Sequence, residues 1–169
     1  METAQQWKCE SISYSKYVSQ AMHAEVVSLQ GNSTAKKAAK LITKYKIGCV
    51  VIRDENGVPI GIVTEKDLVS KVIAESEKGM TPNTHLRYLM SSPLITIGAY
   101  STLGSAARVM TSQDIKRLPV VDDTGKLVGI ITLSDILRET MVDPSLSQEA
   151  AMEYIHEVLS FVYSQAKTP

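Results

Sequence analysis

The sequence predicts an α+β fold made of two copies of one structural unit. When the chain is shifted by 68 positions, residues 22–70 align with 90–138 without a gap, and 13 of the 49 pairs are identical. Each copy joins β-rich runs to a segment with helical apolar spacing. Each copy also contains an acidic glycine turn, DENG at 54–57 and DDTG at 122–125, which is typical of hairpins. Two copies are too few for a solenoid, so we expect a closed pair.

Each copy is expected to begin with a short strand, at 26–29 in the first copy and at 94–97 in the second. The hydroxyl pairs Ser33-Thr34 and Ser101-Thr102 follow these strands and predict helix N-caps. In the second copy the helix after the cap carries apolar residues at i, i+3, i+4 and i+7, and we expect these to be buried: Leu103, Ala106, Ala107 and Met110.

A hairpin and a closing helix complete each copy. The runs CVVI and PIGIV predict the two hairpin strands of the first copy, and LPVV and LVGII predict those of the second. The segments KDLVSKVIAE and SDILRETM then predict a closing helix, with Asp67 and Asp135 near its start. The order in each copy is therefore β-α-β-β-α.

Composition excludes several classes of protein. The 18 basic and 18 acidic residues balance, which disfavours a nucleic-acid-binding surface. The two cysteines, Cys9 and Cys49, are too few for a disulfide scaffold. No apolar run reaches the length of a membrane span, and the polar N-terminus does not resemble a signal peptide, so we expect a cytoplasmic protein. The histidines, among them His23, are scattered and lack metal-ligand spacing, and no catalytic constellation or phosphate loop is present, so we expect no enzyme.

These features resemble a tandem pair of CBS domains, the cystathionine-β-synthase repeat that forms a Bateman module. The resemblance covers about residues 12–141 and is carried by the duplication, by the run KRLPVVDDTGKLVGIIT, and by the endings GIVTEKD and GIITLSD. It implies a first repeat with a lead-in helix at 12–80, a second repeat at 81–141, and packing of the two about a pseudo-twofold axis. It also implies two clefts between the repeats that bind adenine nucleotides.

The repeated threonine and aspartate suit such a ligand on chemical grounds. A carboxylate can accept two hydrogen bonds from a ribose diol, and a threonine hydroxyl with helix-start N–H groups suits a phosphate. The purely structural interpretation is that Asp67 and Asp135 are N-caps and that Thr64 and Thr132 only fill a turn. The recurrence of the pair, together with the resemblance, favours a binding site.

By resemblance, each cleft takes its ribose and phosphate contacts from one repeat and its adenine wall from the other. The first cleft combines Thr132, Ser134 and Asp135 with a wall of Glu25, Val26, Val27, Ile47 and Gly48. The second combines Thr64 and Asp67 with a wall of Pro93, Leu94, Ile95 and Ile115.

The repeats differ where the family holds phosphates, because the second has Lys116-Arg117 and the first has Gly48-Cys49. The resemblance then assigns Lys116 to the Asp135 cleft and Arg117 to the Asp67 cleft, with Lys66 as a helper. Arginine can bind phosphate oxygens bidentately, whereas lysine acts as a point charge. We therefore expect unequal sites, and Ser134 favours the Asp135 cleft.

The C-terminal segment 144–166 is expected to be helical, with Ser145 and Gln148 as a capping box and an apolar face. That face either packs on its own module or forms a dimer or effector contact. The resulting hypothesis is a regulatory module that binds AMP, ADP or ATP, with or without Mg²⁺, forms a homodimer and signals to a separate protein. Two alternatives stay open: S-adenosylmethionine or a dinucleotide as ligand, and a dimerising adaptor without a ligand.

Overall fold

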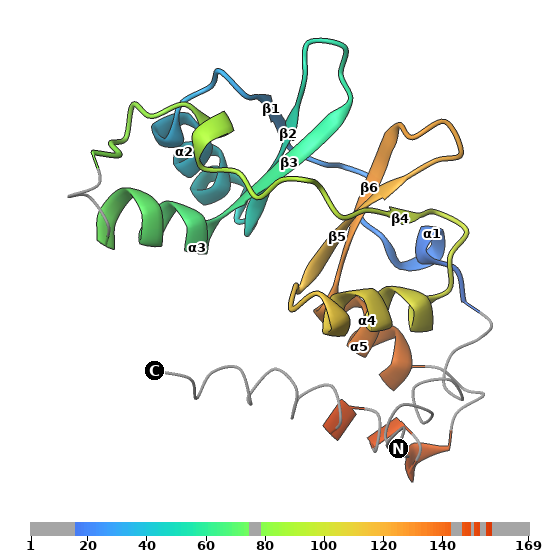
Figure 1. The fold of residues 1–169 in the computed structure, drawn as a ribbon. Coiled ribbons are helices and arrows are strands. Elements are labelled where there is room, and N and C mark those ends of the chain that lie inside the picture. The colour runs from blue at the N-terminus through green and yellow to red at the C-terminus, as the bar shows by residue number, and fades with distance from the viewer. Residues whose placement is uncertain (1–15, 75–78, 143–146, 150, 153–154, 157–169) are drawn as a thin grey trace, which may run out of the picture. The chain divides into compact units, whose positions relative to one another are not determined.

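The computed structural model describes residues 16–74, 79–142, 147–149, 151–152 and 155–156 (Figure 1). The chain forms two compact units. One, the β1–β3 unit, contains Ala24–Thr96 and Val121–Val128. The other, the α4–α5 unit, contains the chain up to His23, Ile97–Val120, and the chain from Gly129 onward. The segment that precedes each repeat therefore belongs to a different unit from the body of that repeat.

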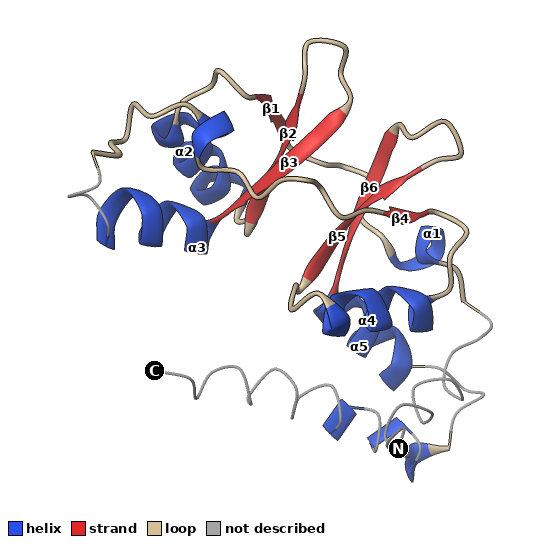
Figure 2. Ribbon diagram, viewed as in Figure 1, coloured by secondary structure: helices blue, strands red, loops and turns tan. Residues whose placement is uncertain are grey.

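The first repeat has the predicted β-α-β-β-α order. Its elements are β1 (Ser28–Gln30), α2 (Ala35–Tyr45), β2 (Cys49–Arg53), β3 (Pro59–Thr64), α3 (Glu65–Asp67) and the π-helical turn η2 (Leu68–Ala74). β1 pairs parallel to β2, and β2 pairs antiparallel to β3 through the predicted hairpin. In Figure 2 the helices α2 and α3 lie on the same side of this sheet.

The second repeat follows the same plan, preceded by the 3-10 turn η4 (Leu86–Tyr88). Its elements are β4 (Ile97–Gly98), α4 (Leu103–Ser112), β5 (Arg117–Val121), β6 (Leu127–Thr132) and α5 (Leu133–Met141), and its sheet has the order β4-β5-β6. The α+β class and the repeat order are thus confirmed.

The predicted N-caps are half right. Thr34 Oγ1 accepts a hydrogen bond from Lys37 N, and Thr102 Oγ1 accepts one from Ser105 N. Ser33 and Ser101 are not the caps, since each lies one residue before the capping threonine. β1 and β4 also begin later than expected, because their pairing with β2 and β5 starts only at Ser28 and Ile97.

Burial follows the predicted pattern. In α4 the four residues Leu103, Ala106, Ala107 and Met110 are all buried. Around β2 a second core gathers Val50, Ile52, Val63, Leu86 and Leu89. Cys49 is buried, whereas Cys9 lies outside the described residues.

The lead-in helix expected at the start of the first repeat is represented in the described residues by α1 (Val18–Ala21). The helix expected at 144–166 lies largely outside them, with its predicted capping residue Ser145. No helix among the described residues is long and apolar enough to cross a membrane.

Candidate functional site

Each repeat places its threonine and aspartate at the junction between the last strand and the closing helix. Thr64 Oγ1 donates to Asp67 Oδ2 over 2.6 Å, Thr64 N donates to the same oxygen over 2.9 Å, and Asp67 N donates back to Thr64 Oγ1 over 3.2 Å. In the second repeat Thr132 and Asp135 make the same three bonds, in the same order, at 2.6, 2.9 and 3.3 Å. Both junctions are therefore capping boxes.

The geometry corrects the structural interpretation of these residues. Thr64 and Thr132 are the N-caps, and Asp67 and Asp135 stand at the third helical position. A threonine hydroxyl can accept the third-position N–H, and the carboxylate at that position can reach back to the cap N–H. The aspartate thus engages the cap through one oxygen, Oδ2, and its other oxygen serves different partners.

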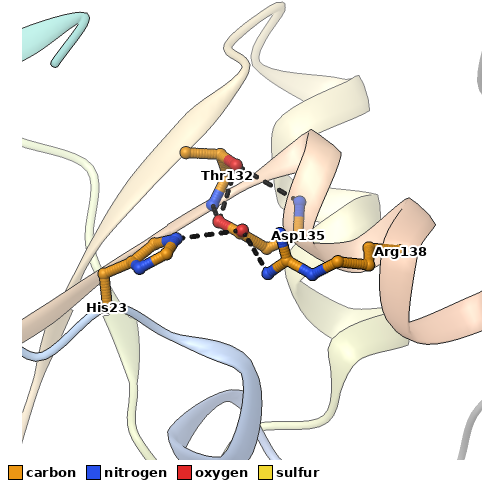
Figure 3. A network of polar contacts seen from close by, with 4 residues as sticks. All are labelled: His23, Thr132, Asp135 and Arg138. Atoms are coloured by element: carbon orange, nitrogen blue, oxygen red, sulfur yellow. Dashed lines mark hydrogen bonds and ion pairs between the residues drawn. The ribbon is translucent and has the colours of Figure 1, made fainter. Parts of the chain in front are cut away.

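In the second repeat the other oxygen of Asp135 meets the side chains of an arginine and a histidine (Figure 3). Arg138 Nη2 lies 2.8 Å from Asp135 Oδ1, and His23 Nε2 lies 3.1 Å from it. The Asp135 side chain is only 3% exposed, whereas the side chains of His23 and Arg138 are 60% and 57% exposed. A buried carboxylate is thus covered by two side chains that solvent reaches.

In the first repeat Asp67 Oδ1 has one partner among the residues that the structure describes. Lys71 Nζ lies 2.7 Å from Asp67 Oδ1 and also donates to the carbonyl oxygen of Leu89 over 2.6 Å. Lys71 therefore connects the Asp67 carboxylate to the segment that precedes the second repeat. The two junctions have the same Thr–Asp capping box but differ in the basic side chains that bind the aspartate Oδ1 atom.

Both carboxylates are stabilised in the ionised form. Burial raises the pKa of Asp135, but the hydrogen bonds from the Thr132 hydroxyl and N–H and from His23 outweigh it, so the pKa lies below its ordinary value. Burial likewise raises the pKa of Asp67, and the bonds from Lys71 and Thr64 outweigh it with the same net result. Both groups are therefore hydrogen-bond acceptors at neutral pH.

Close backbone packing brings His23 to Asp135. His23 and Ile130 exchange two backbone hydrogen bonds of 2.9 Å, and Met22 lies over Gly129, where a Cβ atom would be 2.5 Å from the Met22 sulfur. The first repeat has the same arrangement, with Met90 over Gly61 and Ser91 bridged to Ile62. The contact of His23 with Asp135 was not predicted from the sequence. The repeated pairs Met22/Met90 and Gly61/Gly129 were the available signal, but they do not reveal that each methionine meets the glycine of the other repeat.

The structure also locates the predicted phosphate-binding residues. The carbonyl oxygen of Lys116 accepts a hydrogen bond from Leu133 N over 2.9 Å, which fixes the Lys116 backbone beside the Thr132–Asp135 junction. Gly48 makes the equivalent bond with Glu65 N in the first repeat, over 3.2 Å, and carries no cation there. Arg117 opens β5, while Lys66 and Ser134 are exposed residues of α3 and α5.

The predicted adenine walls fall mostly in the β1–β3 unit. This unit contains the wall expected for Asp135, namely Glu25, Val26, Val27, Ile47 and Gly48, as well as Asp67 with Pro93, Leu94 and Ile95. Asp135 and Ile115 belong to the α4–α5 unit. Assembly of the two clefts from both repeats therefore stays a prediction.

Two cavities lie within the β1–β3 unit. An apolar one of about 560 Å³ lies between α2 and η2 and is lined in part by Ala39, Ile42, Val69, Val72 and Ile73. A polar one of about 400 Å³ lies near the hairpin turns and is lined by Ala24, Val26, Ser28, Arg53, Asn56, Gly57, Lys126 and Leu127.

Comparison with known proteins identifies the family. The sequence profile of the CBS domain matches residues 18–74 and 86–142. An uncharacterized protein of Methanopyrus kandleri is 39% identical over 130 residues, which are 76% of this chain and 63% of that protein. The chain therefore spans less than two thirds of that relative's length.

Two solved structures hold small molecules. The CBS domain pair of protein MJ0100, in complex with 5-methylthioadenosine and S-adenosyl-L-methionine, is 28% identical, with a TM-score of 0.63 over 73% of this chain and 94% of that one. The structure of CBSX2 in complex with AMP is 25% identical, with a TM-score of 0.61 over 74% of this chain and 96% of that one.

Proposed function

The chain belongs to the CBS domain family as a tandem pair, and we propose that it is a regulatory module that binds adenine nucleotides. The observation that carries the proposal is the repeated junction of a capping threonine with an ionised, largely buried aspartate. A fixed carboxylate is the group that recognises a ribose diol. The similarity to structures that hold AMP or S-adenosylmethionine supports an adenosine ligand.

In this proposal Asp67 and Asp135 accept the ribose hydroxyls. Thr64, Lys66, Lys116, Arg117, Thr132 and Ser134 contact the phosphates, and the aliphatic residues of the predicted walls contact the adenine. To bind, the diol has to share the Oδ1 atom of each aspartate with its present side-chain partners or replace them there. At Asp135 these are the side chains of His23 and Arg138, which are exposed and can therefore move aside into solvent when a ligand enters. The Asp135 site is proposed as the stronger one.

A second candidate ligand is S-adenosylmethionine or methylthioadenosine, because the MJ0100 pair holds both. These molecules share the adenosine diol with AMP but lack phosphates. Lys116 and Arg117 favour a phosphorylated ligand, since a sulfonium gains nothing from two cations.

A thermal-unfolding panel tests the proposed function. AMP, ADP, ATP, S-adenosylmethionine and NADH are each added well above the expected dissociation constant. A ligand at about 100 times its dissociation constant stabilises the fold by about 2.7 kcal/mol, which raises the midpoint by several degrees at this chain length. A rise with an adenine nucleotide supports the proposal. A rise with S-adenosylmethionine alone favours the second candidate, and no rise with any compound favours the adaptor.

Regulation requires a partner, and the proposal includes a homodimer and a separate effector protein in the cytoplasm, without catalysis by the CBS pair itself. Binding can shift a conformational equilibrium only if the two states bind the ligand with different affinities. The apolar cavity between α2 and η2 supports a protein contact, because it is bordered by Val69 and Ile73, which are 60% and 70% exposed.

We predict that Ile73→Lys converts a dimer to a monomer, because it places a charge on this apolar surface. Light scattering after size exclusion measures the mass. The matched control is Val58→Lys, an exposed hairpin position whose equivalent in the second repeat is Lys126. A monomeric wild-type chain, or a dimer that survives Ile73→Lys, contradicts this part of the proposal.

A further inference from the structure

The polar cavity near the hairpin turns has the chemistry of an anion site. Its lining contains two charged residues, Arg53 and Lys126, and both are basic. Ser28 and Asn56 add a hydroxyl and an amide. Its volume of about 400 Å³ is within the range of small-molecule sites, about 300–1,000 Å³.

The donors that line this cavity are available. The side chains of Ser28, Arg53 and Asn56 make no hydrogen bond or ion pair with the part of the chain that the structure describes. Arg53 ends β2 and is exposed, so its guanidinium retains five N–H donors for a ligand.

Two acidic residues of the adjacent hairpin turns, Asp54 and Asp122, accept hydrogen bonds within those turns. Asp54 Oδ1 accepts hydrogen bonds from Asn56 N and Val58 N, at 2.9 and 2.8 Å. Asp122 Oδ1 accepts from Thr124 N, from the Thr124 hydroxyl and from Lys126 N, at 2.9, 2.6 and 3.0 Å. These bonds, with the charge of Lys126, lower the pKa of Asp122 despite some desolvation. The turns that carry the two carboxylates thereby also place Asn56 and Lys126 at the cavity.

Neither basic residue of this cavity recurs at the equivalent position of the other repeat. A shift of 68 positions relates Arg53 to Val121 and Lys126 to Val58. The pseudo-equivalent set of residues therefore carries two valines where this cavity carries two cations. If the hairpin turns themselves required a basic residue at these positions, both repeats would carry one.

We propose that this cavity binds a phosphorylated small metabolite, with Arg53 and Lys126 contacting the phosphate and Ser28 and Asn56 contacting its polar remainder. Arginine binds phosphate through paired N–H donors, and lysine adds a point charge. The site does not include Thr64, Asp67, Thr132 or Asp135, so it does not depend on the proposed nucleotide sites. Val26 is the one residue that the cavity shares with a predicted adenine wall.

A titration of the ¹⁵N-labelled full chain with glucose 6-phosphate, followed by amide chemical shifts, tests this proposal. Glucose and sodium chloride at equal ionic strength are the controls for the uncharged ring and for screening. The expected result is a saturable shift of the amides of Arg53, Asn56, Gly57 and Lys126 that glucose and sodium chloride do not produce. Because the shifts are assigned to residues, the result is independent of whether nucleotides bind at the Thr–Asp junctions.

Two variants locate the charge requirement. Arg53→Gln and Lys126→Gln are each expected to weaken the affinity about tenfold, as loss of a charge-assisted hydrogen bond does. Lys40→Gln, an exposed residue of α2, removes the same charge away from the cavity and is expected to leave the affinity unchanged. Shifts confined to the Thr64–Asp67 and Thr132–Asp135 junctions, equal shifts with glucose, no saturable shift, or equal weakening by Lys40→Gln would each overturn the proposal.

Discussion

Among the described side chains of the site, Asp135 has the most hydrogen-bond and ion-pair partners. One oxygen completes the cap with Thr132, and the other faces His23 and Arg138. This division gives the carboxylate two tasks, which are to fix the start of α5 and to present an ionised acceptor near solvent. The structural and the binding interpretations of the aspartate are therefore compatible, because they use different oxygens.

The lowered pKa of Asp135 predicts a pH-dependent stability. Since the folded-state pKa lies below the ordinary value of 3.8, ionisation of Asp135 favours the folded chain. The contribution is fully present above that ordinary value and is lost as the pH falls through the folded-state pKa. We expect Asp135→Asn to lower the free energy of unfolding by about 1.5–3 kcal/mol at pH 7, the range for hydrogen bonds to charged groups.

Urea unfolding at neutral pH and at a series of acidic pH values measures this difference. The gap between wild type and Asp135→Asn is expected to narrow as the pH falls below the ordinary aspartate value. Asp123→Asn, an exposed turn residue, is the control and should change little at any pH. A gap that is constant with pH would mean that the ionised carboxylate does not stabilise the fold.

At the scale of elements, the lead-in segments are the feature that connects packing to the site. Met22 and Met90 each lie over a glycine of a strand, and the glycines are needed because a Cβ atom there would be 2.5 Å from the methionine sulfur. At Gly129 the Cβ would also lie 3.0 Å from the backbone oxygen of His23, whereas at Gly61 the three nearest atoms all belong to Met90.

These contacts predict partial rescue in two double-mutant cycles. Gly61→Ala and Gly129→Ala should each destabilise by about 1–3 kcal/mol through overpacking. Met90→Ala and Met22→Ala should each relieve part of that cost, because they remove the methionine Sδ and Cγ atoms that crowd the added Cβ. One close contact stays in each pair, with the Met90 Cβ at 3.1 Å and the His23 backbone oxygen at 3.0 Å. Coupling energies from urea unfolding measure the rescue, and the absence of coupling in both pairs would contradict the packing.

The local features of each repeat could be predicted from the sequence because they depend on neighbouring residues. The threonine caps, the hairpins around DENG and DDTG, and the buried face of α4 are of this kind. The partners of Asp67 and Asp135 were not predicted. Lys71 and Arg138 need the helix register, and His23 needs a contact across 112 positions. The late starts of β1 and β4 depend on pairing with β2 and β5, which no single segment encodes.

At the scale of the whole molecule, the two repeats carry two junctions with the same Thr–Asp capping box. The basic side chains that bind the aspartate differ between them. Asp67 is held by a lysine that also binds the carbonyl oxygen of Leu89, and Asp135 is held by two exposed side chains. The basic residues of the second repeat, Lys116 and Arg117, have no counterpart in the first. Binding sites that arise from such a pair should differ in affinity even though their caps are equal.

The proposal of one nucleotide site per aspartate is tested by calorimetric titration into wild type, Asp67→Ala and Asp135→Ala, with the nucleotide that raises the unfolding midpoint most. Each substitution is expected to remove one site and leave the other, with the tighter site lost in Asp135→Ala. Complete loss of binding from either single substitution, or unchanged binding in both, would contradict the assignment of one site to each aspartate.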